Sequence, residues 1–367
     1  MKRYAWLCLL TASVMLFAVS CKGPGNGDNE TTTTTVVAVT TTTTTATAAL
    51  VPWIDTHAHP LGTDTDCTSS ACVDTIIAAM DASGVRKTIF MHPPSPAADE
   101  TKEALIRTVV SYAPDRLYYG GGGNTLNALI QRCPETGEAP AGLVDQFDEN
   151  LQDLLDAGAV YVFGELTALH LSYYEGHAFE EQRADSALFL RLADSAAPLG
   201  IPLDIHMDVV AQDMATPDFF LELSETNPAT LQENVTAFEE LLRHNRSAKI
   251  ILVHVGRDTT GDMTAELMEQ LLEDHDNLYM QIHPVSLPLF SDTAIVNKKG
   301  IIRTEWLELL KAYPDRFVMG SDMFFAGAEE AAELEKIQAF LQQLPEDLTV
   351  KIGCTNAVTI YGLPEGC

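Results

Sequence analysis

From residue 50 onward, the chain repeats one pattern: a short run of β-branched or aromatic residues, then a longer stretch with helical spacing of apolar residues. The runs predicted as strands are 53–56, 87–91, 117–120, 160–163, 202–205, 249–253, 277–281 and 316–319. The stretches predicted as helices are 73–83, 99–112, 144–157, 185–197, 231–244, 264–274, 303–312 and 326–344. Eight such units predict an α/β fold of the (β/α)8 TIM-barrel type, with an open doubly wound sheet as the rival arrangement.

Residues that can bind a metal ion stand at the ends of these predicted strands. His57 and His59 follow the first strand, and their i, i+2 spacing directs both side chains to one side of an extended segment. The fourth, fifth, sixth and eighth strands lead into four further residues of this kind, which are Glu165, His206, His254 and Asp322. Barrel enzymes build their sites at the carboxyl ends of the strands, so this placement favours the barrel over the open sheet.

Burying carboxylates and imidazoles at several strand ends is costly unless they have a partner. A divalent cation removes that cost, and a mixed set of histidine and carboxylate is one that zinc and similar metals favour. The sequence therefore predicts a metal site at the barrel mouth.

The order and spacing of these residues resemble the amidohydrolase superfamily of metal-dependent barrels over essentially all of residues 51–363. Within it, the chain is similar to the amidohydrolase-related branch that includes TatD-like and decarboxylase-like members. The segment 352–357, Ile-Gly-Cys-Thr-Asn-Ala, is similar to the Asn-Ala helix that closes the domain in that branch. The resemblance implies that residues 50–367 form a single catalytic domain.

The resemblance also implies a ligand set. TatD-like members place a glutamate in a Gly-Glu context after the fourth strand, as in Gly164-Glu165 here, which implies Glu165 as a shared ligand. One ion would then bind His57, His59 and Asp322, and the other would bind His206 and His254. The alternative is a single ion on His57, His59, His206 and Asp322, with His254 orienting the water. In either case the implied cofactor is Zn²⁺, with one or two ions per chain.

The function implied is a metal-dependent hydrolase that uses metal-activated hydroxide on a small-molecule amide, ester or lactone, or phosphoester. Asp322 would be the proton shuttle and His254 the second catalytic residue. Two alternatives stay open: a non-oxidative decarboxylase of a small aromatic acid, and a non-catalytic surface lipoprotein that binds a ligand or a metal. The segment 166–168 departs from the sequence usual in TatD nucleases, and a net charge of −30 disfavours nucleic acid as a partner.

Further polar residues near the predicted strand ends are candidates for substrate binding: His92, Asn124, His170, Arg257 and His283. Arg257 is suited to clamp a carboxylate or a phosphate. The alternative for each is a loop side chain that forms hydrogen bonds with its neighbours and does not bind substrate. We expect His177, His244 and His275 to be solvated.

The N-terminal region carries a targeting pattern rather than a fold. Residues 1–20 combine Lys2 and Arg3 with an apolar run, and Cys21 follows in a context that resembles the lipobox of bacterial lipoproteins. Residues 21–49 predict a flexible linker, since 12 of the 17 residues in 31–47 are threonine. These features predict a lipid-anchored protein of the bacterial cell envelope whose lipid is its only membrane contact. A secreted protein in which Cys21 has no role is the alternative, and the oligomeric state stays open.

Five cysteines remain once Cys8 and Cys21 are set aside, so at least one thiol is left over or pairs elsewhere. Cys67 and Cys72 are close enough in sequence to close one loop, which is possible outside the cytoplasm.

Overall fold

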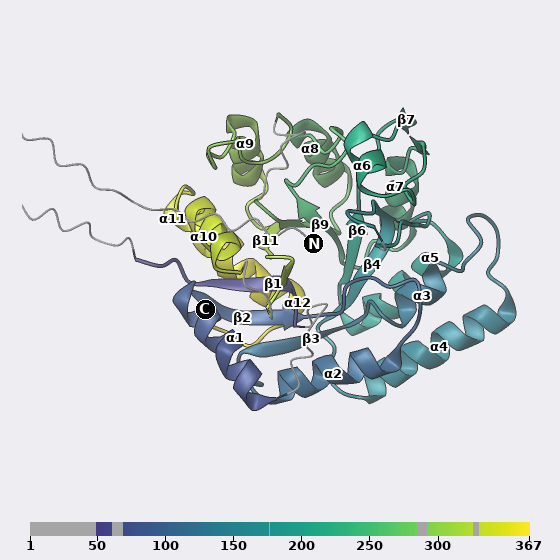
Figure 1. Ribbon diagram of the computed structural model, residues 1–367, viewed down its shortest axis with the longest axis horizontal. Helices are drawn as coiled ribbons and strands as arrows, with labels where there is room; N and C mark the ends of the chain where they lie inside the picture. The colour runs from purple at the N-terminus through teal and green to yellow at the C-terminus, as the bar shows by residue number, and fades with distance from the viewer. Residues whose placement is uncertain (1–48, 61–68, 176, 285–291, 326–329) are drawn as a thin grey trace, which may run out of the picture. The chain divides into compact units, whose positions relative to one another are not determined.

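Eight parallel strands form the wall of a barrel, and helices lie outside them (Figure 1). The wall strands are β1 (Trp53–His59), β2 (Val85–Phe90), β3 (Leu117–Gly122), β4 (Val162–His170), β6 (Leu203–Met207), β9 (Ile250–Val255), β10 (Leu278–Ile282) and β11 (Phe317–Met319). Their hydrogen-bonded order is β11-β10-β9-β6-β4-β3-β2-β1-β12. The short β12 (Met323–Phe324) directly follows β11 in the chain and pairs in parallel with β1, so the sheet closes on itself. The (β/α)8 barrel is confirmed over the open doubly wound sheet.

The computed structural model describes residues 49–367, apart from 61–68, 176, 285–291 and 326–329. Ala49–Cys367 is one compact unit. The expected signal peptide, Cys21, nearly all of the threonine-rich linker and Cys67 lie outside the described residues. Within the described part, no helix has both the length and the apolar character that a bilayer crossing needs.

One helix follows each wall strand at the place that the sequence predicts. These helices are α1 (Ser70–Ala82), α2 (Glu100–Ser111), α4 (Ala141–Asp156), α5 (Ala187–Ala196), α7 (Val235–His244), α8 (Ala265–Asp274), α9 (Thr304–Ala312) and α10 (Glu330–Leu341). Each buries one stripe against the sheet; in α7 the stripe consists of Ala237, Phe238, Leu241 and Leu242.

Several short elements were not predicted. Besides β12 and the later α11 (Glu346–Val350), they are α3 (Leu126–Ile130), β5 (Glu180–Glu181), the 3₁₀ turn Ala197–Leu199, β7 (Met214–Ala215), α6 (Asp218–Leu223) and β8 (Thr230–Leu231). The predicted helix 231–244 starts too early, because Thr230–Leu231 pair with Met214–Ala215 as a small antiparallel ribbon. The fourth strand is longer than predicted, since β4 runs on to His170 and pairs there with β5.

The barrel interior is filled by alternate residues of the strands, among them Ile54, Ile89, Val162, Ile251 and Val318. They pack with side chains from the C-terminal segment, which contains α11 (Glu346–Val350), a π-helical turn (Lys351–Thr355) and α12 (Asn356–Tyr361). The segment 352–357, expected to resemble a closing helix, spans the π-helical turn and the first residues of α12.

The C-terminal segment is tied down by covalent and polar contacts. Cys354 and Cys367 form a disulfide, and Cys133 is a buried free thiol. The Lys87 ammonium on β2 donates to the carbonyls of Pro364, Glu365 and Gly366. Asn356 donates to the carbonyl of Phe317 at the start of β11, at 2.7 Å. These contacts hold the end of the chain against the barrel.

Candidate metal centre

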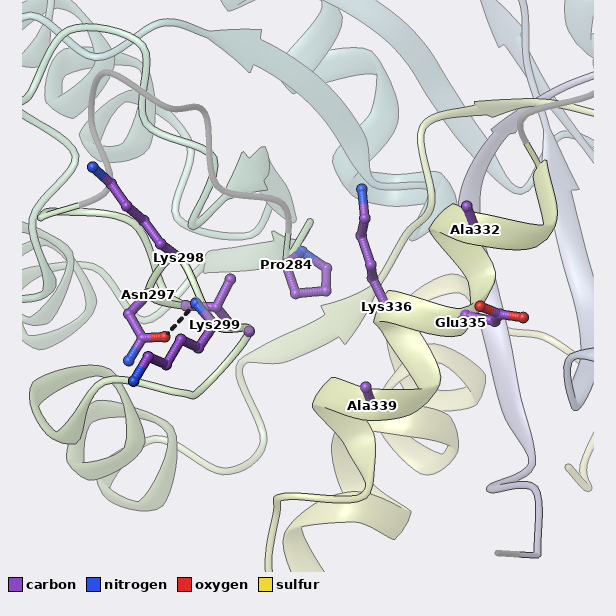
Figure 2. Close-up of a pocket in the computed structure, with 10 residues that line it drawn as sticks. Pro284, Asn297, Lys298, Lys299, Ala332, Glu335, Lys336 and Ala339 are labelled. Carbon is purple, nitrogen blue, oxygen red and sulfur yellow. Dashed lines mark hydrogen bonds between the residues drawn. The ribbon is translucent and has the colours of Figure 1, made fainter. Parts of the chain in front are cut away.

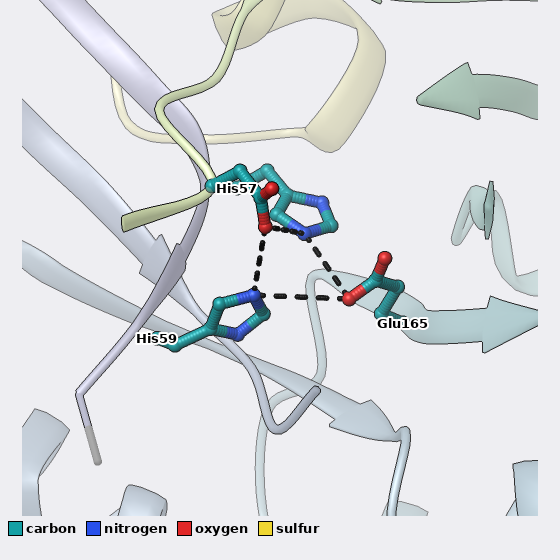
Figure 3. Close-up of side chains that lie close together, drawn as sticks. His57, His59 and Glu165 are labelled. Atoms are coloured by element: carbon teal, nitrogen blue, oxygen red, sulfur yellow. Dashed lines mark hydrogen bonds and ion pairs between the residues drawn. The ribbon is translucent and has the colours of Figure 1, made fainter. Parts of the chain in front are cut away.

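All six predicted ligands come together at the barrel mouth, in two groups that share one carboxylate. The first group is His57, His59, Glu165 and Asp322, and the second is Glu165, His206 and His254. Within each group the potential ligand atoms lie within 4.8 Å of one another. Figure 3 shows the imidazoles of His57 and His59 and the carboxylate of Glu165 directed toward one another.

The two oxygens of Glu165 face different groups. Oε2 lies 3.5 Å from His57 Nε2 and 3.7 Å from His59 Nε2. Oε1 lies 2.8 Å from His206 Nδ1. Glu165 stands inside β4 rather than at its end, at the point where pairing with β3 stops at Gly164.

Hydrogen bonds outside the cluster set the tautomers of the first two histidines. His57 Nδ1 lies 3.2 Å from the Asp204 carboxylate, and His59 Nδ1 lies 3.0 Å from the carbonyl oxygen of Met91. Since Nδ1 of each ring donates in these bonds, Nε2 is the ring nitrogen that faces the cluster. Within the described residues, His57 Nε2 and both ring nitrogens of His254 are buried with no hydrogen-bond partner. Unpartnered imidazole nitrogens beside two carboxylates fit a divalent metal.

Asp322 closes the first group. Its Oδ1 lies 3.2 Å from His59 Nε2 and 3.6 Å from His254 Nε2, and its backbone N–H donates to the His57 carbonyl at 2.9 Å. The neighbouring Ser321 donates through its N–H and its hydroxyl to the buried carboxylate of Asp55, at 2.9 and 2.5 Å. Asp55 therefore fixes the loop that carries Asp322 against β1.

Two cluster residues have a left-handed backbone: φ is 58° at His254 and 55° at Asp322. A non-glycine residue in this region costs about 1–3 kcal/mol, and such strain gathers at functional sites. The His254 conformation is supported by Gln281, whose side-chain oxygen accepts the His254 N–H at 2.8 Å. Gln281 fits only because residue 320 is glycine, since a Cβ there would lie 2.2 Å from Gln281 Nε2.

Gly164 has a similar role beneath His57. A Cβ at position 164 would lie 2.7 Å from Asp204 Cβ, so glycine lets Asp204 approach β4 and reach His57. The Gly-Glu pair in the sequence thus combines a shared carboxylate with the space for the residue that orients a second ligand.

The carboxylates of the cluster are ionised. Burial opposes this, but His57 and the hydrogen bond from His206 hold the pKa of Glu165 well below its usual range. Burial likewise acts against ionisation of Asp322, and His254, His59 and Arg257 together hold its pKa well below the usual range. Burial lowers the pKa of the His254 imidazole well below its usual range, and the neighbouring Asp322 carboxylate acts in the opposite direction.

Three of the five predicted substrate-binding residues touch the cluster. Arg257 Nη1 donates to Asp322 Oδ2 at 2.9 Å, and His283 Nδ1 lies 3.9 Å from the same oxygen. The His170 ring lies 4.1 Å from the His206 ring, centroid to centroid.

The other two predicted residues contact each other. Asn124 Nδ2 lies 3.2 Å from His92 Nδ1, and the His92 carbonyl accepts the Glu165 N–H at 3.4 Å. Among the histidines expected to be solvated, His244 is exposed. His177 is half-buried with its ring 4.7 Å from that of His170, and His275 is buried against Glu239, so the expectation was wrong for these two.

Sequence reasoning missed two buried carboxylates that hold ligands in place. Asp204 binds His57, and Asp208 Oδ2 lies 3.9 Å from His206 Nε2 while the carboxylate accepts the Thr259 hydroxyl at 2.6 Å. Both stand near His206 in an otherwise apolar stretch, two residues before it and two after. The available signal was an acidic residue inside an apolar strand, for Asp204, and directly after that strand, for Asp208.

A sequence model described as amidohydrolase matches residues 133–363, more than half of the chain. This chain belongs to the amidohydrolase family. The matched range contains Glu165, His206, His254 and Asp322 and begins after the two histidines of β1. No curated protein matches the sequence.

Solved structures resemble this amidohydrolase at low identity. An uncharacterized TIM-barrel protein from Bordetella bronchiseptica has a TM-score of 0.50 and 14% identity, over 85% of this chain and 99% of that one. Amidohydrolase 2 from Bifidobacterium longum subsp. infantis has a TM-score of 0.43 and 12% identity, over 86% and 100%. A D-hydantoinase from Bacillus sp. AR9 has a TM-score of 0.44 and 15% identity, over 84% and 71%. The first of these similarities supports the barrel fold.

Family membership and the cluster together support a metal-dependent hydrolase or a related activity of the superfamily. The cluster is suited to a divalent metal.

Proposed function

We propose that this amidohydrolase is a metal-dependent hydrolase of a small-molecule amide, ester or lactone, or phosphoester. The observation that carries the proposal is the division of the cluster into two ligand groups around Glu165, whose two oxygens face opposite groups. Two Zn²⁺ ions are the cofactors we propose. His57, His59 and Asp322 would hold one, His206 and His254 the other, and Glu165 both.

When bound, such ions act as Lewis acids and lower the pKa of a coordinated water. The chain's own residues supply proton transfer. Asp322 is ionised and projects into the cluster, so it can accept the proton of the attacking water and donate it to the leaving group. His254 lies 3.6 Å from Asp322 Oδ1 and is the second catalytic residue. His92, Asn124, His170, Arg257 and His283 are proposed to bind the substrate.

The test is to replace Asp322 by asparagine and to assay metal-loaded protein on panels of esters, lactones, amides and phosphoesters. Asp322→Asn keeps the size of the side chain but cannot accept the proton, so we expect kcat to fall by about 10³-fold or more with the circular dichroism unchanged. Asp194→Asn is the control, because the only partners of Asp194 among the described residues are His244 and Asn245 on the surface. Wild-type activity in Asp322→Asn would contradict the assignment.

Metal analysis separates the alternatives. Two ions per chain support the hydrolase, while one ion together with release of CO₂ from aromatic acids would favour the decarboxylase. If the protein contains no tightly bound metal and shows no turnover of any substrate, the ligand-binding lipoprotein is favoured.

We further propose a lipid-anchored location in the bacterial cell envelope, with a small molecule and no nucleic acid as partner. The support is the sequence around Cys21 together with the threonine-rich segment. Cys21→Ala should move the protein from the membrane fraction to the soluble fraction, whereas Cys133→Ala should not. Unchanged membrane partitioning of Cys21→Ala would refute the anchor.

A further inference from the structure

Arg257 stands at the edge of the candidate metal centre with most of its hydrogen-bonding capacity unused. It follows β9, and its side chain is 18% exposed. A guanidinium has five N–H donors, and among the described residues the side chain of Arg257 makes one hydrogen bond, to Asp322 Oδ2. The remaining donors are available to a ligand that enters the site.

Aromatic and imidazole side chains surround Arg257. Its guanidinium carbon lies 4.9 Å from the ring centroid of Tyr173, which in turn packs edge-on against His170 at 5.7 Å. His170 and His283 are each more than nine-tenths buried, and Nδ1 of each has no hydrogen-bond partner within the described part of the chain. His170 touches His206, and His283 lies beside Asp322, so these groups continue directly from the cluster.

The geometry of the free guanidinium donors favours a carboxylate. The guanidinium is paired with Asp322, and the carboxylates of Asp208 and Glu165 also act on it electrostatically. A carboxylate carries a single negative charge, and its planar shape matches two parallel N–H donors of an arginine.

We propose that Arg257 binds a carboxylate of the substrate, so that the substrates are amides, esters or lactones that also carry a free carboxylate group. This inference rests on the proposed hydrolase function and narrows it. The Tyr173 ring orients the guanidinium by packing against it, and His170 and His283 supply further polar contacts beside the bound anion.

A second basic region offers the competing location for an anion. Lys298 and Lys336 lie on opposite sides of Pro284 around a cavity of about 780 Å³ (Figure 2). No described residue lining it is a predicted metal ligand, and Lys336 is already paired with Glu333 at 2.7 Å. An anion bound there would lie in a different cavity from the bond that is cleaved at the metal centre. Arg257 is therefore the better position for a carboxylate of the substrate.

The kinetic test compares two esters of equal length, the mono-para-nitrophenyl ester of glutaric acid and para-nitrophenyl valerate, on zinc-loaded enzyme. We expect wild type to prefer the glutarate ester in kcat/KM by about tenfold or more, mainly through KM. Arg257→Met should bring that preference close to one, a loss of about tenfold or more, as expected when hydrogen bonds to a charged group are removed. Arg257→Lys should retain part of it, and Lys336→Met should retain all of it. Zinc content is measured for each variant so that rates refer to loaded enzyme.

A wild-type preference near one, an unchanged preference in Arg257→Met, or its loss in Lys336→Met would each overturn the inference. A binding experiment separates this inference from the proposed function. Calorimetry on metal-free protein should show valerate binding at least tenfold more tightly than valeramide, with the difference absent in Arg257→Met. If nothing in the ester, lactone, amide and phosphoester panels is hydrolysed, the hydrolase proposal fails while this experiment still decides the role of Arg257. Equal binding of valerate and valeramide by wild type would refute it.

Discussion

Asp204 is the residue whose replacement tests the construction of the metal centre most directly. It is fully buried, and both of its oxygens lie 3.2 Å from His57 Nδ1. Burial raises the pKa of its carboxyl, and His57 acts in the opposite direction. Asp204→Asn keeps an oxygen that can accept the His57 proton but removes the negative charge.

The magnitude follows from the kind of bond that is changed. A hydrogen bond to a charged group contributes about 1.5–3 kcal/mol, and a neutral one about 0.5–1.5 kcal/mol. Losing the charge should therefore weaken the support of a metal-bound His57 by about 1–2 kcal/mol, which is about 5- to 30-fold in zinc affinity. Asp204→Ala removes the bond altogether and should cost about 100-fold, the upper end for partners of metal-binding histidines.

Zinc affinity is measured by competition with a chromogenic chelator at constant pH. Glu103→Gln is the matched control, because Glu103 is also a buried carboxylate but binds Tyr119, Gly122 and Asn124 instead of a cluster residue. We expect its zinc affinity to stay within about threefold of wild type. If Asp204→Asn and Asp204→Ala also bind zinc within threefold of wild type, the claim that Asp204 orients His57 for a metal is wrong.

Three further predictions concern stability. Removing the metal with a chelator should lower Tm by about 5 °C or more, and zinc should restore it, since an ion at 1,000 times its Kd stabilises by about 4 kcal/mol; an unchanged Tm would argue against a tight site. Cys367→Ser opens a disulfide of sequence separation 13 and should cost about 3 kcal/mol in urea unfolding under oxidising conditions, a difference that a reductant should abolish. Burial raises the pKa of Glu180 to about 7, so its ionisation destabilises the fold progressively as pH rises from about 4.5 to 7. Glu180→Gln should therefore stabilise metal-free protein by about 2–3 kcal/mol at pH 8 and by less than half of that at pH 5.5; a gain independent of pH would refute the assignment.

The barrel could be predicted because its signals are local. Short continuous runs of β-branched or aromatic residues and stretches with the helical period of about 3.6 can be read within one segment, and eight repeats leave few possible topologies. The missed elements are short: α6 and the β7–β8 ribbon lie in a connection where tertiary contacts, rather than periodicity, decide the conformation. The same contacts shortened the helix that was predicted to begin at residue 231.

The six proposed ligands could be predicted because each is a polar residue of metal-binding type at or near the end of an apolar strand. Their supporting residues could not. Asp204 and His57 are 147 positions apart, and Asp55 and Ser321 are 266 positions apart. No pattern in the sequence around any of these residues predicts that the two side chains of a pair are in contact. The buried state of His275 was missed for the same reason, since it depends on Glu239 in a different helix.

The sequence by itself determined the strand order along the chain, the residue types at the strand ends and the expectation of a metal. Closure of the sheet through β12, the sharing of Glu165 between two groups and the contact of Arg257 with Asp322 were decided only in the tertiary structure. The physical reason is that chain periodicity fixes which face a residue occupies, whereas a binding site depends on distances between faces of different strands. Those distances are set by how the whole barrel packs.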